Sequence, residues 1–214
     1  QIYLETLVET NRYMNLTAIT DPAEVWAKHF LDSAMLLRQI SVPLGGSVLD
    51  VGTGAGFPGM VIAILRPDLR VTLLDSLQKR VTFLEETAAA LGVSQQVTCI
   101  HSRAEDAAKL PRYREQFDLV TARAVAELPV LTEYCLPFVK AGGYFIAYKS
   151  GDIDAEAEGA KRAVSLLGGR IESVEKMTLP GTDIERSFVF VKKEKPTPKK
   201  YPRKAGLPSK EPLG

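Results

Sequence analysis

A glycine-rich turn between an apolar run and a proline constrains this sequence most. Residues 48–51 form a short apolar run that contains Asp50, glycines follow at positions 52, 54 and 56, and Phe57-Pro58-Gly59 comes next. This order predicts a buried strand, a turn without bulky side chains and the start of a helix. In such a turn a ligand can lie directly against the backbone.

Strand and helix patterns alternate after this turn. Strands are predicted over 47–51, 70–74, 97–101, 117–121 and 143–149, and helices over 58–66, 77–91, 126–139 and 152–168. The alternation predicts an α/β fold with a parallel sheet and helices on both faces. Residues 170–177 and 186–192 follow as two strands without a helix between them, which predicts an antiparallel hairpin. Five parallel strands and this hairpin resemble the Rossmann-like, seven-stranded sheet of class I methyltransferases.

The chain divides into three segments. Residues 1–46 are predicted to form an N-terminal helical cap with Trp26 in its core, and residues 47–194 the Rossmann-like core. Residues 195–214 are rich in proline and basic side chains, so we expect a flexible tail without a packed core. Residues 192–214 carry eight Lys or Arg and two Glu, against a net charge of +1 for the whole chain. A basic tail of this kind attracts nucleic-acid phosphates.

Asp50 distinguishes between two ligands for the glycine turn. Gly54 to Gly59 also fits the G-x-G-x-x-G pattern of dinucleotide-binding proteins, and Asp75 suits a ribose in either ligand. A carboxylate beneath the turn would repel a pyrophosphate by roughly a few kcal/mol at about 4 Å. It would attract the amino group of S-adenosylmethionine instead. We therefore expect S-adenosylmethionine as the cofactor, with a NAD-type oxidoreductase as the alternative.

Ligands in open α/β sheets bind outside the carboxyl ends of the strands. This rule selects residues after all five predicted parallel strands, with Lys149 after the fifth. Ala104-Glu105, after the third, can supply a backbone amide and a carboxylate to adenine. The predicted cofactor-binding residues are Asp50, Gly52, Gly54, Gly56, Phe57, Asp75, Ser76, Ala104, Glu105 and Arg123.

The segment after the fourth strand limits which kind of atom can accept the methyl group. It reads Thr121-Ala122-Arg123-Ala124, without the Asn/Asp-Pro-Pro-aromatic motif of enzymes that methylate amino groups, and Cys99 and Cys135 lie inside predicted elements. Guanine N7 has its own lone pair and loses no proton, so it needs only positioning. Arg123 could hold guanine O6 or the methionine carboxylate, and Lys149 could bind the base or a phosphate. We place both at the catalytic centre.

The whole chain resembles the bacterial small-subunit ribosomal RNA guanine-N7 methyltransferases, also called the glucose-inhibited division protein B family. The matching stretches are Asn15 to Ile19, His29 to Ser33, Leu49 to Gly59, Leu74 to Arg80, Arg103 to Glu105, Thr121 to Ala124, Tyr148-Lys149 and Thr197 to Gly206. The resemblance implies that Gly52, Phe57, Ala104, Glu105 and Arg123 bind S-adenosylmethionine. It implies a guanosine in the 530 loop of 16S ribosomal RNA as substrate, free or in the small ribosomal subunit.

Several expectations accompany this resemblance. His29 and the tail residues Lys199, Lys200, Arg203 and Lys204 are expected to bind RNA. We expect a cytoplasmic monomer that uses no metal and does not contact a membrane. An RNA-binding ribosome-assembly factor without catalysis remains a further alternative.

Overall fold

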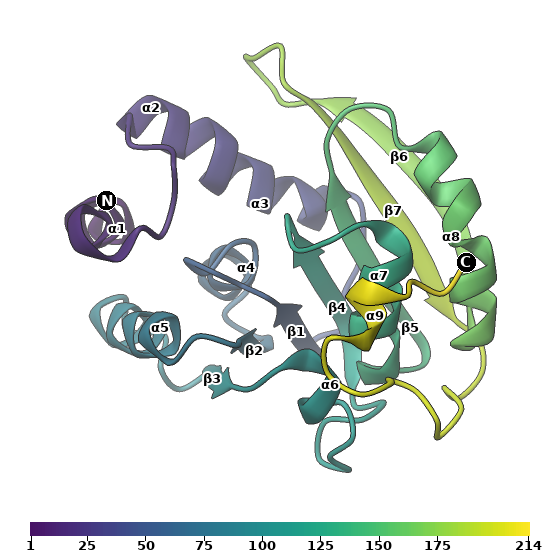
Figure 1. Ribbon diagram of the computed structural model, residues 1–214. Helices are drawn as coiled ribbons and strands as arrows, with labels where there is room; N and C mark the ends of the chain where they lie inside the picture. Colours follow the sequence, from purple (N-terminus) through teal and green to yellow (C-terminus); the bar gives the residue numbers. More distant parts are fainter.

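Seven strands form one sheet in the order β3-β2-β1-β4-β5-β7-β6 in this computed structural model, which describes residues 1–214 (Figure 1). The strands are β1 (Ser47–Val51), β2 (Arg70–Asp75), β3 (Val97–His101), β4 (Phe117–Arg123), β5 (Val139–Lys149), β6 (Gly169–Thr178) and β7 (Glu185–Lys193). The first five run parallel, and β7 pairs antiparallel with both β5 and β6. The sheet confirms the predicted class I methyltransferase-like fold.

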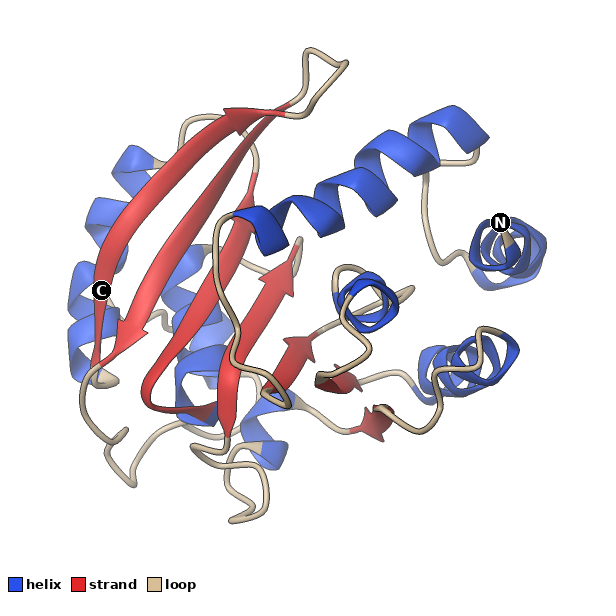
Figure 2. Cartoon of the chain, turned by 180° about the vertical axis from the view of Figure 1, so that it is seen from behind, coloured by secondary structure: helices blue, strands red, loops and turns tan.

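Helices cover both faces of the sheet (Figure 2). The N-terminal helices, α4 (Gly59–Leu65) and α5 (Gln78–Ala90) pack on one face, and α6 (Ala104–Ala107), α7 (Leu128–Cys135) and α8 (Asp154–Leu166) pack on the other. Successive strand residues point to opposite faces, so Val48 joins the first core and Leu49 joins the second. Because both faces are covered, the central strands are mostly apolar, and their buried polar residues Asp50 and Thr121 are hydrogen-bonded to each other.

Residues ahead of β1 form two helical stretches. The first is α1 (Ile2–Met14), which lies beside α5, and the second runs through α2 (Pro22–Val25), a π-helical turn (Trp26–Leu31), α3 (Asp32–Met35) and a 3-10 turn (Leu36–Arg38). The second stretch begins where Asp21 accepts a hydrogen bond from the backbone of Glu24 and Pro22 occupies the first turn. It carries His29 and Asp32 to Arg123 at the end of β4.

The prediction for Trp26 is wrong. Its side chain is 52% exposed and leans on Phe30, with 4.9 Å between the ring centroids. The helix is wound as a π-helical turn at this point. Because that winding uses more residues per turn, it rotates side chains away from the face that a regular helical spacing predicts.

The prediction of a flexible tail is also wrong. Residues 195–214 pack along the core, with Thr197 and Tyr201 buried, and end in the short helix α9 (Leu207–Lys210) against α7. Arg114 donates hydrogen bonds to the carbonyl oxygens of Thr197 and Tyr201 at 2.7 and 2.9 Å. The composition of the tail could not reveal these hydrogen bonds, because their donor, Arg114, lies more than 80 positions earlier in the chain.

Two further boundaries differ from the sequence expectation. The predicted helix over 126–139 ends at Cys135, and a 3-10 turn (Leu136–Phe138) leads into β5 at Val139. Pro137 cannot continue an α-helix interior, which explains the early end. The short helices α6 and α9 have one turn each, so they leave no helical period in the sequence.

No helix in the chain combines the length and the apolar character that crossing a bilayer requires.

Candidate functional site

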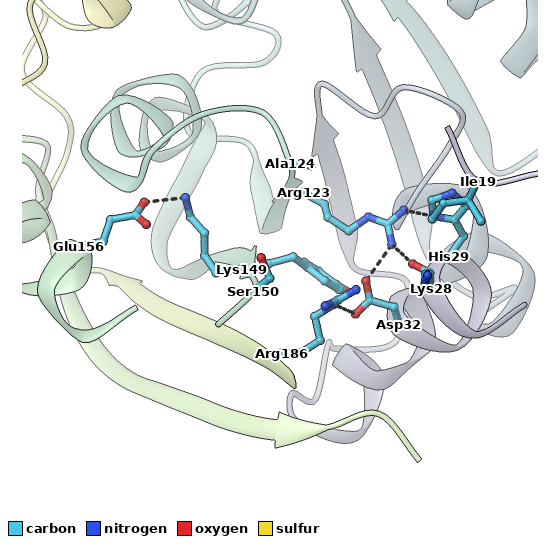
Figure 3. Close-up of a pocket in the computed structure, with 11 residues that line it drawn as sticks. Ile19, Lys28, His29, Asp32, Arg123, Ala124, Lys149, Ser150, Glu156 and Arg186 are labelled. Atoms are coloured by element: carbon cyan, nitrogen blue, oxygen red, sulfur yellow. Dashed lines mark hydrogen bonds and ion pairs between the residues drawn. The ribbon is translucent and has the colours of Figure 1, made fainter. Parts of the chain in front are cut away.

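Two clefts lie at the carboxyl edge of the parallel strands. The donor cleft, a name used here for a cavity of about 160 Å³, is lined by Val51, Gly52, Leu74, Asp75, Ser76, Ser102, Arg103, Ala104, Glu105, Val125 and Tyr134. The acceptor cleft, of about 490 Å³, is lined by Ile19, Lys28, His29, Asp32, Arg123, Ala124, Tyr148, Lys149, Ser150, Glu156 and Arg186 (Figure 3). Arg123 and Ala124 line the acceptor cleft and the next residue, Val125, lines the donor cleft, so the end of β4 lies between two adjacent cavities.

The glycine turn is built on the Asp50 carboxylate. Asp50 is fully buried and accepts hydrogen bonds from the Thr53 hydroxyl at 2.6 Å, the Gly59 amide at 2.9 Å and the Thr121 hydroxyl at 2.9 Å. Burial raises the pKa of Asp50 to about 6, against the pull of these hydrogen bonds. The carboxylate that was predicted to face a ligand amino group therefore faces the protein, where it holds the turn to α4 and β4.

Gly52 and Gly56 are required by close approaches. Both have positive φ angles, and a side-chain carbon on Gly52 would lie 2.7 Å from the Cγ2 atom of Val125. A side-chain carbon on Gly56 would collide with the Tyr3 hydroxyl, which donates to the carbonyl of Ala55 at 2.5 Å. Of these glycines, Gly52 lines the donor cleft, whereas Gly56 fits the turn against α1.

Phe57 lies in the core instead of at the apex of a ligand site. Its ring is stacked between Tyr3 and His29, with centroid distances of 5.1 and 4.8 Å. The Arg123 guanidinium lies 5.3 Å from the ring centroid. Phe57 therefore supports the side chains of the acceptor cleft and lines neither cleft itself.

Asp75 ties the end of β2 to the glycine turn. One carboxylate oxygen accepts the Gly54 amide at 3.0 Å and the other accepts the Leu77 amide at 2.9 Å. Ser76 follows it in the wall of the donor cleft. The backbone of Gly54 thus serves to hold Asp75, while the carboxylate itself borders the cavity.

Glu105 is one of the residues that line the donor cleft. It is buried within α6, directly after Ala104, and its Oε1 atom accepts a hydrogen bond from the Gly206 amide at 2.8 Å. Tyr134 of the same cleft shares a hydrogen bond of 2.6 Å with Ser209. The C-terminal segment therefore contacts two residues that line the donor cleft, Glu105 and Tyr134, which the sequence did not predict.

An arginine–aspartate–arginine bridge forms one side of the acceptor cleft. The two oxygens of Asp32 accept hydrogen bonds from Arg123 at 2.9 Å and from Arg186 at 3.0 Å, and the Asp32 side chain is 2% exposed. Arg123 also donates to the carbonyl of Lys28 at 3.1 Å. Figure 3 shows both guanidinium groups converging on this carboxylate. The bridge fastens the helical cap to β4 and β7.

His29 is held as a neutral imidazole. Arg123 can only donate, so the Nδ1 atom of His29 accepts from it at 3.1 Å, and the Nε2–H group then donates to the Thr17 hydroxyl at 2.8 Å. Burial, and after it the charge of Arg123, lower the pKa of His29 to about 4. The ring is thus oriented toward Arg123 without adding positive charge.

Lys149 projects from the end of β5. Its ammonium group donates to Glu156 at 2.6 Å and to the carbonyl of Ala126 at 2.9 Å. Glu156 also accepts the amide of Leu128, the first residue of α7. Lys149 therefore lies at the predicted cleft, but it is engaged with the loop after β4 and with α8.

Of the four tail residues predicted to bind RNA, three are exposed and one is partly buried in an ion pair. Lys199, Lys200 and Lys204 are exposed. Arg203 instead makes a bidentate ion pair with Glu133, whose side chain is fully buried, with hydrogen bonds of 2.7 to 3.0 Å. Arg203 thus neutralises a buried carboxylate on α7, and its contact with RNA stays a prediction.

Arg186 is the main residue of the site that sequence reasoning missed. It stands near the start of β7, which runs antiparallel to β5 and pairs Ser187 with Lys149. The start of an antiparallel strand lies at the carboxyl edge of its parallel neighbours. The predicted hairpin therefore contained a signal for Arg186, as the first cation of a strand that begins at the ligand edge.

Solved structures of S-adenosylmethionine-dependent methyltransferases share this fold. The chain aligns with one from Aquifex aeolicus with a TM-score of 0.60 and 18% identity, over 83% of this chain and 96% of the other. An S-adenosylmethionine-dependent O-methyltransferase from Thermotoga maritima aligns with a TM-score of 0.57 and 15% identity, over 90% and 73%. The fold and the glycine turn beside β1 thus define the class I methyltransferase architecture.

Sequence similarity identifies the family within this class. The rRNA small subunit methyltransferase G family matches residues 1–188. The ribosomal RNA small subunit methyltransferase G of Desulforamulus reducens is 50% identical over 211 residues, covering 99% of this chain and 88% of that protein. The protein of the same name from an Exiguobacterium species is 52% identical over 211 residues, with the same coverage. The chain belongs to the rRNA small subunit methyltransferase G family. This membership does not favour the two alternatives, a NAD-type oxidoreductase and a non-catalytic assembly factor.

Proposed function

We propose that this protein transfers the methyl group of S-adenosylmethionine to N7 of a guanosine in the 530 loop of 16S ribosomal RNA. One observation carries the choice of acceptor atom: the acceptor cleft contains no unpaired base. Asp32 and Glu156 are both ion-paired, and Nδ1 of His29 accepts from Arg123. A nucleophile that must first lose a proton would find no partner here, whereas N7 of guanine needs none.

The donor cleft has groups that fit the cofactor. Gly52 offers backbone without a side chain, Asp75 borders the cavity as a ribose-binding acid would, and Ala104-Glu105 can meet the adenine. Asp50 acts indirectly in this proposal, by holding the turn through Thr53 and Gly59. When bound by these residues, S-adenosylmethionine would supply an electrophilic methyl group on a positively charged sulfur, for which the lone pair of guanine N7 would be the acceptor.

The acceptor cleft positions the base. Arg123 points into the cavity from the boundary between the two clefts, and Arg186, Lys28 and Lys149 add positive charge around it. Arginine favours guanine O6 as an acceptor, and such a contact would leave N7 open toward the donor cleft. Holding the two reacting atoms about 3–3.5 Å apart and in line is sufficient for rate enhancement in a transfer of this kind.

RNA would also contact the exposed tail lysines. Lys199, Lys200 and Lys204 share the C-terminal segment with Gly206, which contacts Glu105 of the donor cleft. They can bind phosphates without displacing any described ion pair. We propose a cytoplasmic location, which a ribosomal RNA substrate supports, and a monomer.

Methyl transfer to unmodified RNA tests this function. Small-subunit RNA from a bacterium that lacks the modification would be incubated with the protein and radiolabelled S-adenosylmethionine, and then cleaved chemically at 7-methylguanosine. We expect label in the RNA and one cleavage site in the 530 loop. Label without cleavage would place the methyl group on another atom, and the absence of label would contradict the proposed function.

A further inference from the structure

We propose that the C-terminal segment, residues 195–214, is a positioning element of the cofactor site that orients Glu105 through the backbone amide of Gly206. The ligand group concerned is the exocyclic amine of adenine. The inference rests on the proposed function, because it takes Glu105 as the acceptor for that amine.

The two oxygens of Glu105 have different surroundings. Oε1 accepts the Gly206 amide at 2.8 Å, and no other group of the protein donates to this carboxylate. Oε2 has no hydrogen-bond partner in the protein. Although Glu105 as a whole is only 4% exposed, this oxygen is not completely buried. Since Glu105 lines the donor cleft, Oε2 remains available to a ligand in that cleft.

Gly206 is held in place from both sides. Upstream, Arg203 is fixed to the buried Glu133 of α7, and its guanidinium also donates to the carbonyl of Glu211 at 2.7 Å. Downstream, Ser209 of α9 shares a hydrogen bond with Tyr134, and α9 packs on α7 (Figure 1). The amide of Gly206 is therefore presented to Glu105 by a segment anchored to the same helix that borders the cleft.

The physical consequence is a fixed acceptor. A carboxylate with one oxygen bound to an amide cannot rotate freely, so its second oxygen keeps one direction. Without the Gly206 amide, Glu105 loses its only protein partner and its orientation must be established when the ligand binds. The ordering cost would then reduce the affinity for ligands that use this oxygen, and leave the affinity for other ligands almost unchanged.

Two cofactor analogues separate this role from general stability. S-adenosylhomocysteine carries the amine that Glu105 accepts, whereas S-inosylhomocysteine carries an oxygen at the same ring position and cannot donate there. Affinities of both would be measured by calorimetry for the full chain and for a chain truncated after Ala205. We expect roughly tenfold weaker binding of S-adenosylhomocysteine to the truncated chain, with little change for S-inosylhomocysteine.

A point substitution covers the case in which the truncated chain does not fold. Gly206 has a φ of +83° with open space around a Cβ atom, so Gly206→Ala strains the backbone and shifts the amide without creating a collision. Gly92→Ala is the matched control, because Gly92 has a φ of +71°, equally open space and a place in the loop between α5 and β3. We expect Gly206→Ala alone to reduce the preference for S-adenosylhomocysteine.

The possible results distinguish a wrong role for Gly206 from a wrong assignment of Glu105 to adenine. Equal losses for both analogues would overturn the inference, because the segment would then act by general stabilisation, and so would an unchanged preference in the truncated chain and in Gly206→Ala. If the full chain itself shows no preference for S-adenosylhomocysteine, the assignment of Glu105 to adenine fails and the inference fails with it. The methyl-transfer assay is independent of all these results.

Discussion

His29 makes the stability of the protein sensitive to mild acid. Its folded-state pKa of about 4 lies below the value of about 6.5 for an unfolded chain. Between these values the unfolded chain binds a proton that the folded chain does not bind, so the free energy of unfolding decreases as the pH falls from 6.5 to 4. The contribution of His29 is fully present above pH 6.5.

Urea denaturation at several pH values measures this effect. We expect His29→Gln to show a smaller loss of unfolding free energy between pH 7 and pH 4 than the native chain shows. His101→Gln is the control, because His101 is exposed at the end of β3. If both substitutions leave the pH profile as it is in the native chain, another group is responsible for the acid sensitivity.

Asp32 is expected to be the most costly single charge to remove from the acceptor cleft. In Asp32→Asn the guanidinium groups of Arg123 and Arg186 would remain beside a neutral amide, both largely buried. Loss of one partner from a buried ionic network typically costs about 3 kcal/mol, and we expect a decrease of that size in the free energy of unfolding. Asp152→Asn, which affects an exposed pair with Lys176, should change it very little. Similar losses in both variants would contradict the role of the bridge.

At the scale of single elements, the attachment of the C-terminal segment depends on Glu133. This carboxylate on α7 is fully buried and is neutralised by Arg203 alone. We expect Glu133→Gln to reduce the free energy of unfolding by about 3 kcal/mol and to speed tryptic cleavage after Lys199 and Lys200. Glu127→Gln, at the exposed start of the same helix, is the control. Unchanged cleavage rates in Glu133→Gln would show that other contacts hold the segment.

Regular elements could be predicted well from the sequence, and short or irregular ones could not. The predicted strands 47–51 and 97–101 agree with β1 and β3 at both ends, because apolar runs bounded by turn residues are strong local signals. The π-helical turn that exposes Trp26 and the one-turn helix α9 have no such signal. Both depend on contacts with distant parts of the chain.

At the scale of the whole molecule, positive charge is concentrated in the C-terminal segment, and this predicts how RNA binding responds to salt. Replacing Lys199, Lys200 and Lys204 by alanine removes exposed charges and no described ion pair. We expect weaker binding to small-subunit RNA, and a salt dependence of the logarithm of the binding constant that is less steep by about two to three. Affinity for S-adenosylhomocysteine should stay the same, because the anchors of Gly206 remain.

Filter binding of RNA at several salt concentrations measures this slope. A variant with Arg70→Ala and Lys140→Ala, at the opposite edge of the sheet, is the control. An unchanged slope in the lysine variant would exclude the C-terminal segment from phosphate binding.

The sequence by itself determined the alternation of strands and helices, the glycine turn, the family and the edge of the sheet where ligands bind, because these follow from local patterns. Only the tertiary structure decided which polar side chains are free. The acceptor of the Thr121 hydroxyl is Asp50, 71 positions away, Arg203 meets Glu133 across 70 positions, and Gly206 meets Glu105 across 101. A buried charge takes the nearest partner in space, and no local pattern in the sequence records which residue that is.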